Sequence, residues 1–295
     1  MMRQSDDTPT PVPGILATLA AGFDLVTKNP WVLLPPLLLD IFLWLGPRLS
    51  FTELIVETAA SLQQTPELAQ MLDPLTLEAL GATNLLAVLS VPLIGLPTLM
   101  TGLSPAQTPL PVAVNSVGSY LELVTLFVGL TIVGLGLTAV FFNLLSSAVT
   151  DQEVNSAAVG SIMRLWLKLI GLALLFLLLM LAIYMMLLPV LLIMALFSST
   201  LVLAGGFLQL MLMTWALLYW FYVPYGLALN GRTLAQAVVE SLQMMRRFLL
   251  PTVGLILVTL LVRQVMGTLM VLADDGSWLT AVSLVAHAFV STALV

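Results

Sequence analysis

The chain has 295 residues, of which 60% are hydrophobic and only 8% are charged. Soluble globular domains are about 25% charged, so most of this surface is not built for water. The net charge of −6 argues against a nucleic-acid partner, which requires a basic surface. The absence of cysteine excludes disulfides, cysteine-ligated zinc or iron–sulfur clusters, and thiol catalysis.

Seven of the nine Lys and Arg residues lie in three stretches that are separated by long apolar runs. Cationic residues collect on the cytoplasmic flanks of membrane spans. We therefore predict a multi-pass protein of a bacterial plasma (inner) membrane with both termini in the cytoplasm. The stretches contain Arg3 and Lys28; Arg164 and Lys168; and Arg232, Arg246 and Arg247.

Residues 1–29 form the predicted cytoplasmic N-terminus, in which 14–29 has the pattern of an amphipathic helix at the membrane surface. The first long apolar run begins only near Pro30, which favours an uncleaved span over a signal peptide. Span 1 is expected at 30–46. It is short and contains Pro35, Pro36 and Asp40.

Residues 47–120 are expected to form an extracytoplasmic helical cap, with helices near 50–63, 66–72 and 75–90. Within it, 84–103 carries no charge and has the length of a span. A span there would invert the downstream topology and move the later basic clusters outside. Pro92 and Pro97 also interrupt it, so two alternatives remain: a re-entrant segment or one that lies on the membrane surface.

The remainder, 121–295, is predicted to be a five-span bundle, which makes an all-α integral membrane protein with six transmembrane helices. A second cytoplasmic amphipathic helix is expected at 230–247. The chain stops at Val295 inside an apolar run, which predicts that the natural chain continues. The five spans are placed at about 121–148, 163–196, 200–226, 248–272 and 277–295.

A candidate polar cluster lies inside the predicted spans, where ionisable groups are costly and often functional. It consists of Asp40, Arg263, Gln264 and His287. The helical rise places Asp40, Arg263 and His287 at similar depths in the outer half of the bundle, which predicts an Asp40–Arg263 ion pair with His287 nearby. The alternatives are a site for an anionic ligand or a proton relay, a pair that only fixes helix register, and an arginine that snorkels.

Two further sets of residues are candidates for contacts with helices and lipids. Small side chains recur at helical spacing along span 2 and predict a close helix–helix contact. Basic residues at the inner ends of spans predict contacts with anionic lipid headgroups. The first set is Thr125, Gly129, Gly136, Ala139 and Asn143; the second is Lys28, Arg164, Lys168, Arg246 and Arg247.

Two segments, AAGFDLVTKNPWVLLPPLLLD (20–40) and AVVESLQMMRRFLLPTVGLILVTLL (237–261), share one pattern: an amphipathic helix, basic residues and an entering span. This pattern resembles the membrane domains attached to glycerophosphoryl diester phosphodiesterases and related bacterial domains of unknown function. The phosphodiesterase catalytic domain has no counterpart here, so its activity is not implied. The resemblance implies a bacterial inner-membrane protein without assigned chemistry.

The chain contains no nucleotide motif, no metal-ligand pattern and no catalytic constellation, so we expect no cofactor, no metal and no enzymatic activity. We expect a structural or accessory protein whose partners are the bilayer and other membrane proteins or a second copy. The alternative is a small transporter, which predicts a solvated cavity around Asp40 and Arg263. An accessory role predicts an exposed apolar patch on 84–103 or on the small-residue face of span 2.

Overall fold

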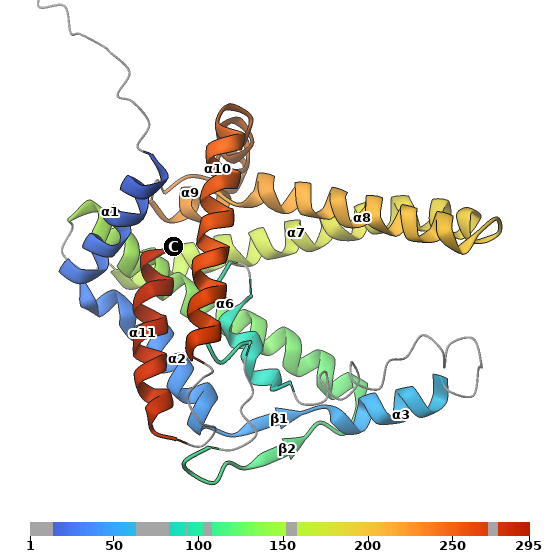
Figure 1. Cartoon of the computed structure of the whole chain (residues 1–295), viewed down its shortest axis with the longest axis horizontal. Coiled ribbons are helices and arrows are strands. Elements are labelled where there is room, and N and C mark those ends of the chain that lie inside the picture. The colour runs from blue at the N-terminus through green and yellow to red at the C-terminus, as the bar shows by residue number, and fades with distance from the viewer. Residues whose placement is uncertain are drawn as a thin grey trace, which may run out of the picture.

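The computed structural model describes residues 14–62, 83–92, 94–102, 108–151, 158–229, 231–270 and 277–295. Helices dominate, as Figure 1 shows, and the described chain adds a single pair of short strands. This confirms the predicted all-α class. The expected helix at 66–72 and the first part of the one at 75–90 lie outside the described residues.

Four helical segments are long and apolar enough to cross a membrane. Two of them are α6 (Tyr120–Thr150) and α7 (Ala158–Ala195). The third combines α8 (Ser199–Trp220) with α9 (Val223–Leu229), and the fourth is α10 (Leu234–Met270). A span requires about 20 residues, and each of these segments exceeds that length.

Two shorter apolar segments occupy the first and last predicted spans. The 3₁₀ helix η1 (Pro30–Leu33) leads directly into α2 (Leu34–Leu45), and α11 (Leu279–Ala293) ends the described chain. At about 1.5 Å per residue, a helix of this size covers roughly 20–25 Å, less than the ~30 Å hydrocarbon core. Membrane length is therefore established for four helices rather than for the six expected.

Local chemistry explains where the long helices begin and bend. The Ser119 side chain accepts a hydrogen bond from Glu122 N (3.2 Å), and the Glu122 carboxylate accepts one from Gly118 N (3.0 Å). This reciprocal capping starts α6. Helix α10 breaks at Phe248, whose backbone is not helical, directly after the two arginines and three residues before Pro251. A proline removes one helical hydrogen bond and favours such a kink.

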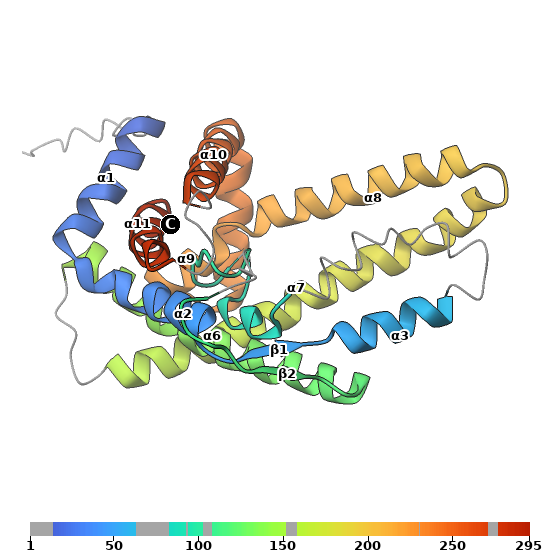
Figure 2. The same ribbon diagram turned by 60° about the horizontal axis from the view of Figure 1, so that its bottom comes forward.

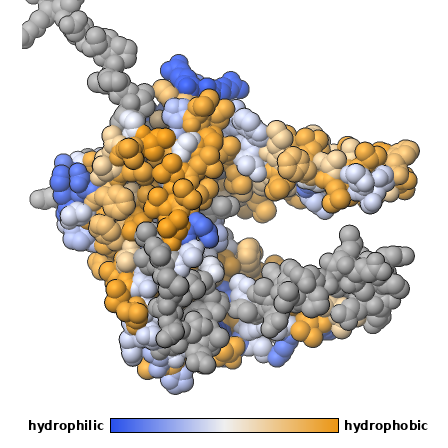
Figure 3. All heavy atoms as spheres, viewed as in Figure 1, coloured by the Kyte–Doolittle hydropathy of each residue, from blue (hydrophilic) through white to orange (hydrophobic). Residues whose placement is uncertain are grey.

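Helices α7 and α8 form a long antiparallel hairpin that projects from the rest of the molecule (Figures 1 and 2). The turn between them lies at Leu196–Ser198, and the Ser198 side chain caps α8 by accepting from Thr200 N (3.1 Å). In the most apolar 18-residue stretch of α7, no residue is buried within the protein. Figure 3 shows apolar side chains over this arm and over the face made by α10 and α11.

The amphipathic helix α1 (Ile15–Lys28) packs against α11 in the structure. The rings of Phe23 and Phe289 lie 5.9 Å apart, and a Cβ at Gly22 would overlap the carbonyl oxygen of Ala293. The backbones thus approach so closely that only glycine fits. We expected this helix on the membrane surface, but one of its faces is part of the helix bundle.

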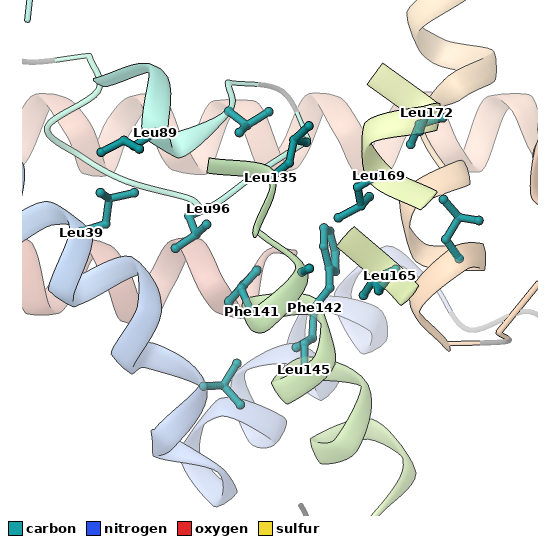
Figure 4. Close-up of a cluster of buried hydrophobic side chains, with 14 of the residues drawn as sticks. Leu39, Leu89, Leu96, Leu135, Phe141, Phe142, Leu145, Leu165, Leu169 and Leu172 are labelled. Carbon is teal, nitrogen blue, oxygen red and sulfur yellow. The ribbon is translucent and has the colours of Figure 1, made fainter. Parts of the chain in front are cut away.

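The segment 84–102 is the largest departure from the predicted cap. It begins with the 3₁₀ helix η2 (Leu85–Ser90), most of its described residues are buried, and six of them belong to the main hydrophobic core. Figure 4 shows Leu89 and Leu96 beside Leu39 of α2 and Leu135 of α6. The segment is therefore inserted between helices; its place relative to a membrane surface, re-entrant or surface-lying, stays a prediction. The apolar patch that an accessory role predicted on 84–103 is limited, among the described residues, to a groove beside α6.

The rest of the predicted cap is partly described. Strand β1 (Arg48–Ser50) pairs in parallel with β2 (Val114–Ser116), and α3 (Thr52–Leu62) follows β1. Helix α3 lies where a helix near 50–63 was expected. The strand pair was not predicted, since each strand is only three residues long and shows no alternating pattern.

Candidate functional site

The Asp40 carboxylate binds the inserted segment. Its side chain is fully buried on α2, with Oδ1 accepting a hydrogen bond from Met100 N (2.9 Å) and Oδ2 accepting one from Leu99 N (3.1 Å). Hydrogen bonds to a carboxylate are about twice as strong as neutral ones. Both oxygens are thus used to hold irregular backbone, whose N–H groups need partners wherever water is absent.

The predicted Asp40–Arg263 ion pair is wrong. The only salt bridge between described residues joins Arg232 Nε to Glu240 Oε1 at 3.0 Å. Arg263 and Gln264 lie exposed on the last two turns of α10, whereas Asp40 is buried against the inserted segment. The depth argument rested only on the positions of charged side chains along the helices. It did not take backbone N–H groups into account, and two of them bond to the Asp40 carboxylate.

His287 is buried on α11 but bonds within its own helix. Its Nε2 lies 3.0 Å from Ser291 Oγ, and its Nδ1 is buried without a hydrogen-bond partner among the described residues. The described chain has no group of three or more His, Cys, Asp or Glu that could hold a metal ion. Of the four predicted cluster residues, Arg263 and His287 lie close enough to interact electrostatically, whereas Asp40 is bonded to the inserted segment and Gln264 is exposed.

The inserted segment satisfies its own polar groups. Leu96 N donates to Ser90 O (2.9 Å) and Gly95 N to Val91 O (2.8 Å). Thr101 Oγ1 donates to Ser90 Oγ (2.9 Å) and also bonds Thr98. These bonds compensate for the cost of burying backbone away from a regular helix.

Asn84 anchors the start of this segment, and sequence reasoning missed it. Its Oδ1 accepts from Leu86 N and from Leu49 N, both at 3.1 Å, so it caps η2 and ties it to β1. An Asn directly before an uncharged apolar run is a capping signal that could have been found. The long-range bond to Leu49 could not.

The small-residue face of α6 divides into two halves. Thr125 and Gly129 are exposed, whereas Ala139 is fully buried. Asn143 Nδ2 donates to Ser161 Oγ of α7 (2.9 Å). Gly136 faces Trp166 of α7, whose Nε1 donates to Ile132 O (2.9 Å). The predicted close contact therefore exists only along the C-terminal half of α6.

The five basic residues predicted to contact lipid headgroups fall into two groups. Lys28, Arg164, Arg246 and Arg247 are exposed, as a headgroup contact requires. Lys168 instead donates from Nζ to the carbonyl oxygens of Gly231 (3.1 Å) and Arg232 (2.7 Å). Its charge holds the turn that leads into α10, and its contact with lipid headgroups stays a prediction.

Two of the cavities between described residues bear on function. A small one of about 120 Å³ lies between α1, α6, α9 and α11, with Gly22, Tyr225 and Thr292 in its wall. A larger groove of about 540 Å³ lies between η2 and the N-terminal half of α6. Neither is lined by Asp40, Arg263 or His287.

No protein-family model, curated protein or solved structure matches this chain. The candidate site therefore rests on its own geometry: a buried carboxylate that clamps an inserted segment, and an apolar groove beside that segment.

Proposed function

We propose that this protein is a non-enzymatic integral membrane protein, structural or accessory in role, that engages bilayer lipid and partner membrane proteins. Six membrane-embedded helices, with α2 and α11 as the two short ones, would place both termini in the cytoplasm and 47–120 on the opposite side, from which 84–102 would enter between the helices. The positions of the basic clusters support this topology. The resemblance noted above supports a bacterial inner membrane.

The bonding of Asp40 carries the proposal. A transport site must exchange water or solute, but both oxygens of this carboxylate are bonded to backbone amides and the side chain is fully buried. Removing a backbone donor from such an acceptor in an apolar interior is costly. Asp40 therefore has the environment of a structural clamp, which counts against the alternative of a permease built on it.

The extent of exposed apolar surface supports lipid or protein partners. Large apolar side chains of the hairpin, such as Leu177 on α7 and Leu203 and Phe207 on α8, are more than half exposed. Monomeric soluble proteins rarely expose apolar patches beyond a few hundred Å². A bilayer covers such a surface, and so does another membrane protein or a second copy of this chain.

Cysteine accessibility tests this proposal against the permease, because the chain contains no native cysteine. Ser90→Cys and Ser291→Cys place thiols at sites only 1% exposed, near Asp40's segment and beside His287. Ser116→Cys on exposed β2 is the matched control. A membrane-impermeant thiol reagent applied to intact cells should label only the control. Labelling of both buried thiols, with protection by a small solute, would instead establish a water path and overturn the proposal.

A further inference from the structure

The groove beside the inserted segment has the size of a ligand site. Its volume is about 540 Å³, within the roughly 300–1,000 Å³ typical of small-molecule pockets. Leu85 and Val88 of η2 form one wall, and Val124 and Phe127 of α6 form the other. None of the described residues that line it is charged.

The main polar atoms in the wall already have partners. Asn84 Oδ1 accepts two backbone hydrogen bonds, and Thr101 Oγ1 bonds Ser90 and Thr98. A ligand with polar groups would lose hydrogen bonds to water on entry and find few replacements. The groove therefore favours a ligand that is apolar along its whole buried length.

The groove opens onto the outer surface of α6. Val124 and Phe127 line it and are nevertheless 58% and 51% exposed. Helix α6 is itself long and apolar enough to cross a membrane. The groove is thus continuous with the surface that hydrocarbon covers, so a chain can enter sideways from the bilayer without crossing water.

The dimensions favour a hydrocarbon chain over a partner helix. A helix about 10–12 Å wide with a 5.4 Å pitch occupies roughly 400–600 Å³ per turn. The groove would accept about one such turn and leave the rest of a helix outside. A narrow flexible chain can instead be buried over many methylene groups, each contributing about 0.8 kcal/mol.

We propose that this groove binds one acyl chain of a bilayer lipid, held between η2 and α6. The proposal rests on the proposed lipid-engaging function; it adds that the acyl chain is the part of the lipid that binds, and that it binds between η2 and α6. The headgroup would remain outside, because no described side chain in the groove could pair with its charge.

Photo-crosslinking in reconstituted vesicles tests the proposal. The probe is phosphatidylglycerol with a diazirine in the middle of one acyl chain, and adducts are mapped by mass spectrometry. Adducts are expected on residues 85–88, because Leu85 and Ala87 are under 10% exposed and face the groove. Val88→Trp should fill the groove and abolish these adducts. Val128→Trp, one turn beyond Val124 and outside the groove, should leave them intact.

A second blocking variant, Val124→Trp, guards against a folding defect in Val88→Trp, because Val124 is an exposed residue at the groove mouth. Adducts along 128–133 that are not accompanied by adducts on 85–88 would overturn the groove proposal and leave the membrane function standing. Adducts on 85–88 that persist in both blocking variants would also overturn it. Absence of adducts on every helix would remove the proposed function itself.

Discussion

The inserted segment and the α7–α8 hairpin solve the problem of an apolar environment in opposite ways. The inserted segment is irregular, so its backbone amides require partners, and Asp40, Asn84 and Ser90 provide them inside a packed core. The hairpin is regular, satisfies its own backbone and needs little from the protein. One region is held by specific polar bonds, and the other depends on what surrounds it.

This comparison separates two kinds of vulnerability. Changes in the inserted segment should lower the stability of the purified protein in any solvent. Changes on the hairpin surface should act only in a bilayer. The predictions below follow from that difference, beginning with the largest effect.

Asp40→Ala should destabilise the protein most. It leaves Leu99 N and Met100 N without their acceptor, and each unsatisfied buried N–H costs about 1–3 kcal/mol, giving a loss of about 4 kcal/mol. The measurement is SDS-induced unfolding from mixed micelles. Asp40→Asn keeps one acceptor oxygen and should lose less. Asp24→Ala, at an exposed position on α1, is the control and should be neutral; equal losses at both aspartates would refute the clamp.

Leu177→Asp should impair membrane insertion at the centre of α7. Leu177 is 62% exposed, and exchanging Leu for Asp at the middle of a span costs about 3 kcal/mol. Carbonate extraction of membranes measures the loss. The same variant in detergent should unfold almost as the wild type does, because Leu177 has little protein around it. A large loss of stability in detergent would show that protein, not lipid, covers this face.

Gly134→Ala and Gly129→Ala, on the same helix, should change the stability of the protein in opposite directions. A Cβ at Gly134 would meet the carbonyl oxygen of Leu89, and overpacking of this kind costs about 1–3 kcal/mol. A Cβ at Gly129 would meet nothing, and the higher helix propensity of alanine should add up to about 1 kcal/mol. The same unfolding titration compares them. If both variants are stabilised, η2 does not pack against α6 as described.

Lys168→Met should have the smallest effect on stability, about 1 kcal/mol, through loss of its two bonds to the turn before α10. Arg164→Met should leave stability unchanged but weaken binding to anionic vesicles, because Arg164 is exposed. Flotation with phosphatidylglycerol vesicles measures the second property. Weaker flotation of the lysine variant, with unchanged stability, would restore Lys168 as a headgroup contact.

Several elements were predictable because their causes are local. The change from basic to apolar residues at Arg247 coincides with the kink of α10 at Phe248, and the serines after Phe197 coincide with the α7–α8 turn. Hydropathy over a long window identifies a helix of membrane length whatever it touches. The short segments α2 and α11 could not be identified as spans in the same way, because their length alone does not show whether they cross a bilayer.

The candidate site was predictable only in part. That Asp40 and His287 are buried follows from their apolar surroundings, but their partners do not. The two N–H groups that bond to the Asp40 carboxylate belong to residues 99 and 100, about 60 positions further along the chain. No pattern of side chains in a sequence identifies a backbone donor. The groove likewise depends on how η2 packs against α6, and its lining residues look in the sequence like any other apolar residues.

By itself, the sequence determined the helical class of this protein and its apolar helices of membrane length, since both depend on composition and on hydrophobic runs within one segment. The tertiary structure alone decided that 84–102 is inserted in the core, that Asp40 clamps it, and that Arg263 does not pair with Asp40. The physical reason is that every N–H buried away from water needs a hydrogen-bond acceptor, but this need does not determine which acceptor is used. That choice belongs to packing between segments distant in the chain, where single residues such as Gly134 set how closely two backbones approach.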